Sequence, residues 1–128
     1  MEGNSGRKMV LVVEDSKLLR TIILDALKIA GFGTYAVDNG RNGLSSALQV
    51  HPDLIILDVV MPIMDGIAMY QKLRKDDWGK KVPVILLSRE DEHKVLTTLG
   101  EQIDFIPKDD AMVENVITKV KSHLGISQ

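Results

Sequence analysis

The chain has 128 residues, which is too short for two domains. Of these residues, 45% are hydrophobic, which is enough for one substantial core. Lys and Arg number 16 against 18 for Asp and Glu, a formal net charge of -2 that offers no broad basic field, so we expect no direct nucleic-acid partner. Cysteine is absent, no apolar run approaches the roughly 18 to 20 residues of a membrane span, and the first residues lack the core of a signal peptide. These features predict a cytoplasmic protein without a membrane partner.

Short apolar runs alternate with amphipathic segments along the chain. The runs predict strands, and the segments between them have the three- and four-residue spacing of helices. The predicted strands are 9–13, 34–37, 54–57, 83–87 and 103–106. The predicted helices are 16–30, a segment from the turn at Gly40 to His51-Pro52, 66–75, 92–99, and a last helix capped by Asp109-Asp110.

The apolar stripes of these helices are interpreted as core. The first helix should turn inward Leu19, Ile22, Ile23, Ala26, Leu27 and Ala30, and the second Leu44, Ala47, Leu48 and Val50. Trp78, in a polar loop, is expected to pin that loop to the body of the domain. His51, His93 and His123 are expected to be solvated surface residues.

Five strand-helix units predict one α/β domain with a doubly wound parallel sheet, helices on both faces, and the flavodoxin-like strand order 2-1-3-4-5. We expect a flexible lead-in over residues 1–7, the domain over 8–124 and a short tail over 125–128.

The central feature is Asp58, directly after the apolar run 54–57. Such a run is typical of a strand buried on both faces, and Pro62 and Asp65-Gly66 prevent its simple continuation. An aspartate there is a candidate for phosphate, metal or nucleophile chemistry, because ligands bind beyond the carboxyl ends of parallel strands. By itself it also suits a helix cap or turn.

The other strand ends favour chemistry. The predicted order brings together Glu14-Asp15, Asp58, Ser88 and Lys108. Crowded carboxylates repel unless a cation binds, and oxygen ligands without nearby histidine or cysteine favour Mg²⁺ over zinc. Asp58 is then the candidate nucleophile for an aspartyl phosphate, with Lys108 and the ion neutralising charge and Ser88 donating a hydrogen bond. Ser88 as a cap of the fourth helix and Lys108 as a surface lysine remain alternatives.

Over residues 8–124 the chain resembles a response regulator receiver domain, the CheY-like family of two-component signalling. The matching pieces are Val-Glu-Asp-Ser at 13–16, Leu-Asp-Val-Val-Met-Pro-Ile-Met-Asp-Gly at 57–66, Pro-Val-Ile-Leu-Leu-Ser at 83–88 and Phe-Ile-Pro-Lys at 105–108.

The resemblance assigns roles to these residues. It implies that Asp58 is the phosphoacceptor and that Glu14 and Asp15, with Asp58 and the Val60 backbone carbonyl, hold Mg²⁺. It further implies that Ser88 is the switch hydroxyl, that Lys108 binds the phosphoryl group and that Phe105 is the switch aromatic. The phosphoryl group would come from a histidine kinase or a histidine phosphotransfer protein.

Three departures from the family pattern stand out. Arg89 follows the switch hydroxyl where a small residue is usual, which predicts crowding or gating of the phosphate. Asp109 follows Lys108 where proline is common, which predicts a carboxylate near the phosphoryl-binding lysine. The interval from Ser88 to Phe105 is about two residues short, which predicts a frayed fourth helix and makes 90–102 the expected mobile segment.

The leading interpretation is a phosphorylation-controlled interaction module that catalyses only its own phosphorylation and dephosphorylation. It would signal to a downstream protein through the fourth helix, fifth strand and fifth helix, with a homodimer as a further option. The alternatives are a phosphorylation-independent scaffold and a Mg²⁺-dependent phosphohydrolase. The hydrolase is disfavoured because the haloacid dehalogenase pattern has an acid where this chain has Val60.

Overall fold

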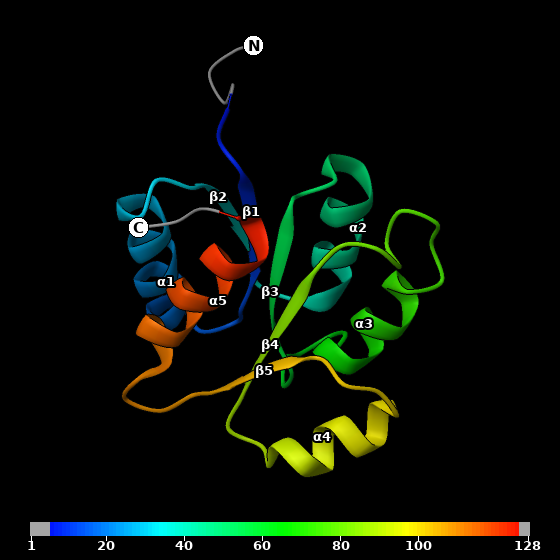
Figure 1. Ribbon diagram of the computed structural model, residues 1–128. Helices are drawn as coiled ribbons and strands as arrows, with labels where there is room; N and C mark the ends of the chain where they lie inside the picture. The colour runs from blue at the N-terminus through cyan, green and yellow to red at the C-terminus, as the bar shows by residue number, and fades with distance from the viewer. Residues whose placement is uncertain (1–5, 126–128) are drawn as a thin grey trace.

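The computed structural model describes residues 6–125, so most of the expected lead-in and tail lies outside the described residues. Within 6–125 the chain forms alternating strands and helices (Figure 1). The strands are β1 (Met9–Val13), β2 (Gly33–Val37), β3 (Leu54–Asp58), β4 (Val84–Ser88) and β5 (Asp104–Pro107). The helices are α1 (Lys17–Ile29), α2 (Gly40–Val50), α3 (Gly66–Leu73), α4 (Glu92–Leu99) and α5 (Met112–Leu124).

The strands make one parallel sheet in the order β2-β1-β3-β4-β5, which confirms the predicted topology. β1 pairs with β2 on one side and with β3 on the other, and β4 joins β3 to β5. β3 and β4 end one residue later than predicted, because Asp58 pairs with Leu87 and Ser88 pairs with Pro107. The two polar side chains are thus held by the sheet ladder itself.

Successive strand residues point to opposite faces of the sheet, so each strand contributes to two cores. Figure 1 shows α1 and α5 on one face and α2 and α3 on the other. Val12 and Ile56 pack with α1 and α5, whereas Val13 and Leu57 pack with α2 and α3. The sheet is therefore covered on both faces, as predicted.

Most helices begin at a side-chain cap. Ser16, Asn39, Asp65 and Asp91 each accept a hydrogen bond from the backbone N–H three residues on. The last helix differs from the prediction: α5 has Ala111 at its N-cap position, without a side-chain cap. Asp109 instead accepts a bond from the Ala111 N–H within the preceding turn, which places the helix start at Met112.

Three residues assigned to the core are exposed. Ile22 is 39%, Leu48 37% and Val50 53% exposed, whereas their helices bury Ile23, Leu27 and Ala47. Each lies beside the buried stripe, one or three residues from a buried position, and the narrow contact with the sheet leaves such flanking positions open. The predicted stripes were therefore too wide.

The predictions for Trp78 and for the histidines hold, with contacts that the sequence did not predict. Trp78 packs against the core, as expected, and its ring also stacks on His51 with centroids 4.1 Å apart and planes 6° from parallel. His123 contacts Asp104 on β5. All three histidines are exposed, as expected, and His51 and His123 also have partners on the surface.

Candidate functional site

The predicted polar residues converge at the carboxyl edge of the sheet. Glu14 follows β1, Asp58 ends β3, Ser88 ends β4 and Lys108 follows β5. Glu14, Asp58 and Ser88 are at most 2% exposed, although burial of charged and polar groups is costly unless they are paired. A crevice of about 390 Å³ opens over them and is lined by Glu14, Asp15, Ser16, Asp58, Val60, Arg89, Glu90 and Lys108.

Lys108 compensates the two buried carboxylates. Its Nζ lies 3.0 Å from Glu14 Oε1 and 3.0 Å from Asp58 Oδ1, and its side chain is 7% exposed. Its backbone N–H donates to the Ser88 carbonyl, which fixes the residue beside the end of β4. Lys108 is therefore part of the crevice, and this excludes the alternative of a surface lysine.

The Asp58 carboxylate is in an environment that disfavours its ionised form. Burial raises the pKa of Asp58 to about 7, because it penalises the ionised form more than the hydrogen bond and charge of Lys108 favour it. The negative charge of Glu14 adds to the rise in pKa. A further cation close to Asp58 would favour its ionised form and so oppose this rise.

The acids satisfy the first requirement of a hard-metal site. Glu14, Asp15 and Asp58 each offer an oxygen, and these three oxygens lie within 4.8 Å of one another. Glu14 Oε1 makes the ion pair with Lys108 but no hydrogen bond, and Asp15 is exposed to the crevice. An all-oxygen set open to water suits Mg²⁺, which keeps several waters when bound. The residues present therefore fit the ion that the resemblance implies.

Arg20 holds the acidic turn in place and was missed by sequence reasoning. Its Nη1 lies 2.9 Å from the carbonyl oxygen of Glu14 and 3.4 Å from that of Asp15. The same turn is tightened by the Ser16 N–H, which donates to Glu14 Oε2. Only the position of Arg20 in the first turns of α1, close behind the acids, signals this role in the sequence.

The loop after Asp58 is fastened to the strand end by close backbone contacts. The Gly66 N–H donates to the Val59 carbonyl, and a Cβ on Gly66 would lie 2.1 Å from the Asp58 carbonyl oxygen. Only glycine fits at such an approach. The loop brings Val60, 59% exposed, to the rim of the crevice, in the region where its carbonyl is the predicted metal ligand.

Ser88 is not the cap of α4. Its Oγ accepts a hydrogen bond from the Glu90 N–H at 2.8 Å, while Asp91 caps α4 by accepting from the Lys94 N–H. Because the Ser88 oxygen acts as acceptor, its hydroxyl hydrogen remains available for a different partner. This geometry leaves the predicted switch role open and removes the capping alternative.

The three departures have different outcomes. Arg89 lines the crevice. Asp109 does not line the crevice. Its Oδ1 accepts a hydrogen bond from the Ala111 N–H in the turn before α5, so its carboxylate is not beside the Lys108 ammonium group as expected. α4 forms over Glu92–Leu99 despite the short interval, and Phe105 is half-buried against the core beside it.

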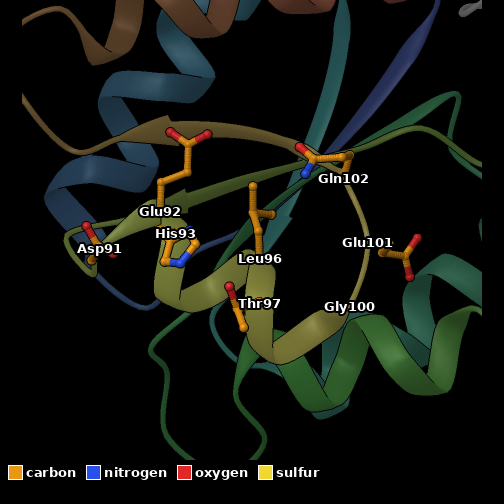
Figure 2. Close-up of a pocket in the computed structure, with 8 residues that line it drawn as sticks. All are labelled: Asp91, Glu92, His93, Leu96, Thr97, Gly100, Glu101 and Gln102. Carbon is orange, nitrogen blue, oxygen red and sulfur yellow. The ribbon is translucent and has the colours of Figure 1, made fainter.

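A larger hollow of about 850 Å³ lies on α4, apart from the crevice (Figure 2). Glu92, His93, Leu96 and Thr97 come from the helix, and Gly100, Glu101 and Gln102 come from the segment that leads to β5. It shares no lining residue with the crevice, so its size does not make it the site of the chemistry.

The fold and the crevice define a two-component receiver, and comparison with known proteins agrees. Residues 10–118 match the response regulator receiver domain, and the chain belongs to this family. It is 30% identical over 122 residues to the polar-differentiation response regulator DivK of Brucella anthropi, covering 92% of this chain and 97% of that protein.

Solved structures show the same likeness. The signal receiver domain of a signal transduction histidine kinase from Syntrophus aciditrophicus is 34% identical, with a TM-score of 0.82, covering 92% of this chain and 90% of that one. The receiver domain of a sensor histidine kinase from Pseudomonas aeruginosa is 22% identical, with a TM-score of 0.83 and coverage of 94% and 99%.

Several curated relatives are much longer than this chain. It spans 42%, 17% and 28% of the length of three of them, so their likeness to it extends only to the receiver portion. Among residues 6–125, no helix has both the length and the apolar character needed to cross a bilayer.

Proposed function

We propose that this chain is a phosphoacceptor domain whose Asp58 takes a phosphoryl group, in the presence of Mg²⁺, from a histidine kinase or a histidine phosphotransfer protein. The observation that carries the proposal is the placement of Asp58 Oδ1 3.0 Å from Lys108 Nζ, inside an acidic crevice. We expect the protein to act in the cytoplasm, where such donors are phosphorylated.

The transfer is an in-line displacement at phosphorus. An Asp58 carboxylate oxygen attacks, a P–O bond forms, and the P–N bond to the donor imidazole breaks with its electron pair returning to nitrogen, which is then protonated from water. Lys108 stabilises charge on the phosphoryl oxygens, and the free hydrogen of Ser88 donates to one of them. In hydrolysis, water attacks phosphorus, the bond to Asp58 breaks, and inorganic phosphate leaves.

Bound Mg²⁺ would neutralise charge on the attacking and transferred oxygens. Glu14, Asp15 and Asp58 would hold it with the Val60 carbonyl, and Arg20 keeps the acidic turn in position. The Pseudomonas receiver has magnesium coordinated in its active-site cleft. At its level of identity the likeness is one of fold, so the case here rests on this chain's own carboxylates.

The signal would leave through α4, β5 and α5. Phosphate on Asp58 would draw the Ser88 hydroxyl toward it, and Phe105 would turn into the space vacated beside β4. A downstream protein then responds only as far as its affinity differs between the two packings. Homodimerisation on this face is a further form that the response can take.

Labelling with acetyl phosphate and Mg²⁺ tests the proposal. We expect a covalent adduct on the wild-type protein, observed as a mass increase, and none on Asp58→Asn. Steady release of phosphate at many turnovers would instead indicate a phosphohydrolase. Absence of any adduct under conditions in which the protein remains folded would indicate a scaffold that works without phosphate.

A further inference from the structure

The crevice contains a second cation, and its state differs from that of Lys108. Arg89 directly follows Ser88, is exposed, and lines the crevice with Asp58 and Lys108. Lys108 is occupied by Glu14 and Asp58, whereas Arg89 makes no hydrogen bond or ion pair to any of residues 6–125. The cation open to an arriving anion is therefore Arg89.

The chemistry of Arg89 suits a phosphoryl dianion. A guanidinium presents several N–H donors in a planar fork, binds phosphate oxygens in pairs and remains charged at all relevant pH values. The crevice is lined by four acids, Glu14, Asp15, Asp58 and Glu90, which repel a dianionic donor before it reaches phosphorus. An exposed cation at the rim offsets that repulsion where the donor enters.

We propose that Arg89 is a donor-binding residue that contacts the phosphoryl oxygens of the incoming phosphodonor and raises its affinity for the crevice. This inference rests on the proposed phosphoacceptor function. It differs from the sequence-based expectation of crowding, since a side chain that only crowds would lower donor affinity. The phosphoryl group would pass from Arg89 to the deeper partners Lys108 and Ser88 as the new bond to Asp58 forms.

The test measures the initial rate of phosphorylation against donor concentration for wild type, Arg89→Ala and Arg89→Lys. At low ionic strength we expect Arg89→Ala to lower apparent donor affinity about fivefold to tenfold, with the maximal rate changed by less than about twofold. Arg89→Lys should retain part of the affinity, because it keeps the charge and loses the fork. The difference should shrink at about 0.5 M salt, since the site is exposed.

Two donors separate the phosphoryl group from the leaving group. Acetyl phosphate releases acetate when its P–O bond breaks, and phosphoramidate releases ammonia, after proton uptake, when its P–N bond breaks. Contact with the phosphoryl oxygens predicts equal losses of affinity for both donors. A loss confined to acetyl phosphate would overturn the proposal, because Arg89 would then be reading the carboxyl group.

Binding is also measured without turnover. Titration with beryllofluoride, followed by ¹⁹F NMR, should show weaker binding to Arg89→Ala. Mg²⁺ affinity, measured separately, should become about twofold tighter, because a cation near the acids has been removed. Lys17→Ala is the matched control: it removes an exposed positive charge at the start of α1, outside the crevice, and should behave as wild type.

The outcomes are distinguishable. Donor affinity that is unchanged or increased in Arg89→Ala, with a wild type that is phosphorylated normally, overturns the role of Arg89 and leaves the proposed function intact. A wild type that takes no phosphoryl group from either donor overturns the proposed function itself.

Discussion

At the scale of single residues, Ile63 is held in an unfavourable conformation. Its φ is 70°, in the left-handed region where a β-branched side chain is crowded, and it is 68% exposed. Ile63→Asn should raise the free energy of unfolding by about 1 kcal/mol, because asparagine tolerates this region and little buried area is lost. Urea unfolding measures the change. Ile63→Val keeps the branch and should give no gain; an equal gain from both would exclude strain as the cause.

The sequence predicted the residues of the crevice better than their contacts. Glu14, Asp58 and Lys108 could be placed together because they end neighbouring parallel strands, and strand ends are set by pattern and topology. The contact of Arg20 with two carbonyls depends on one rotamer of a long side chain, and no spacing rule specifies it. Asp109 also could not be placed from the sequence: its neighbour Lys108 lies in the crevice, whereas the Asp109 side chain accepts a hydrogen bond within its own turn.

At the scale of elements, Asp104 joins β5 to α5 through Lys119 and His123. Burial alone would raise the pKa of Asp104, but the bonds and charges of His123 and Lys119 outweigh it, and the pKa lies below its usual value. A depressed folded-state pKa stabilises the fold above the unfolded value of about 3.9, and this stability is lost as pH falls through the folded value.

Asp104→Asn should therefore lower the free energy of unfolding at neutral pH by up to about 1 kcal/mol, since the pair is partly exposed. The deficit should shrink as pH falls below the unfolded value of about 3.9 and vanish only once wild-type Asp104 is itself protonated. Denaturant unfolding across pH measures this. Asp25→Asn, an exposed acid on α1, is the control. A deficit that stays constant down to pH 3 would show that charge is not the cause.

Element existence was easier to predict than element boundaries and faces. α1 ends at Ile29, and Gly31, with φ 99°, follows its C-cap residue Ala30, close to where the glycine predicts a stop, whereas α5 starts later than the Asp109-Asp110 pair suggested. An aspartate caps a helix only when the residues that follow it are helical. Here the Asp109 side chain accepts from the Ala111 N–H in a turn, and the helix begins only at Met112. Exposed Val50 reflects the end of α2, where His51 turns the chain with φ 55°.

α4 is the element expected to respond to phosphorylation. Within it only Val95 and Leu96 are buried, and Figure 1 shows it standing out beyond β5. Few buried contacts imply a low free energy of local opening. We expect residues 90–102 to exchange amide hydrogens fastest among the ordered elements and to gain protection when beryllofluoride binds with Mg²⁺. Asp58→Asn under the same conditions is the control. Equal protection of the segment with and without the mimic in wild type would contradict the idea.

At the scale of the whole molecule, the buried carboxylates of the crevice lower the stability of the fold. A sheet that buries Glu14 and Asp58 with one lysine between them carries more negative charge than it neutralises. The two hydrophobic cores, one on each face of the sheet, supply the stability that offsets the cost of this arrangement. Removing the charge should therefore stabilise the fold while abolishing phosphorylation.

The corresponding variant is Asp58→Asn. Burial, with Glu14, raises the pKa of Asp58 from 3.8 to about 7, so ionisation of this group opposes folding. Relative to Asp58→Asn, the wild type should lose stability as pH rises from about 4 to about 7 and show no further loss above that. In EDTA at pH 8, Asp58→Asn should be the more stable by about 1 to 3 kcal/mol, less than the full shift implies because the contact with Lys108 is weakened too.

Magnesium should narrow this difference. At a free concentration ten times its dissociation constant, an ion that binds only the folded state adds about 1.4 kcal/mol. The wild type should gain this in urea unfolding, and Asp58→Asn should gain much less because it lacks one carboxylate ligand. Asp109→Asn, whose carboxylate lies outside the crevice, should respond to the ion as the wild type does. If Asp58→Asn were less stable than wild type in EDTA at pH 8, the crowded carboxylates would not be the source of the strain. If Asp58→Asn gained as much stability from Mg²⁺ as the wild type, the metal would bind elsewhere.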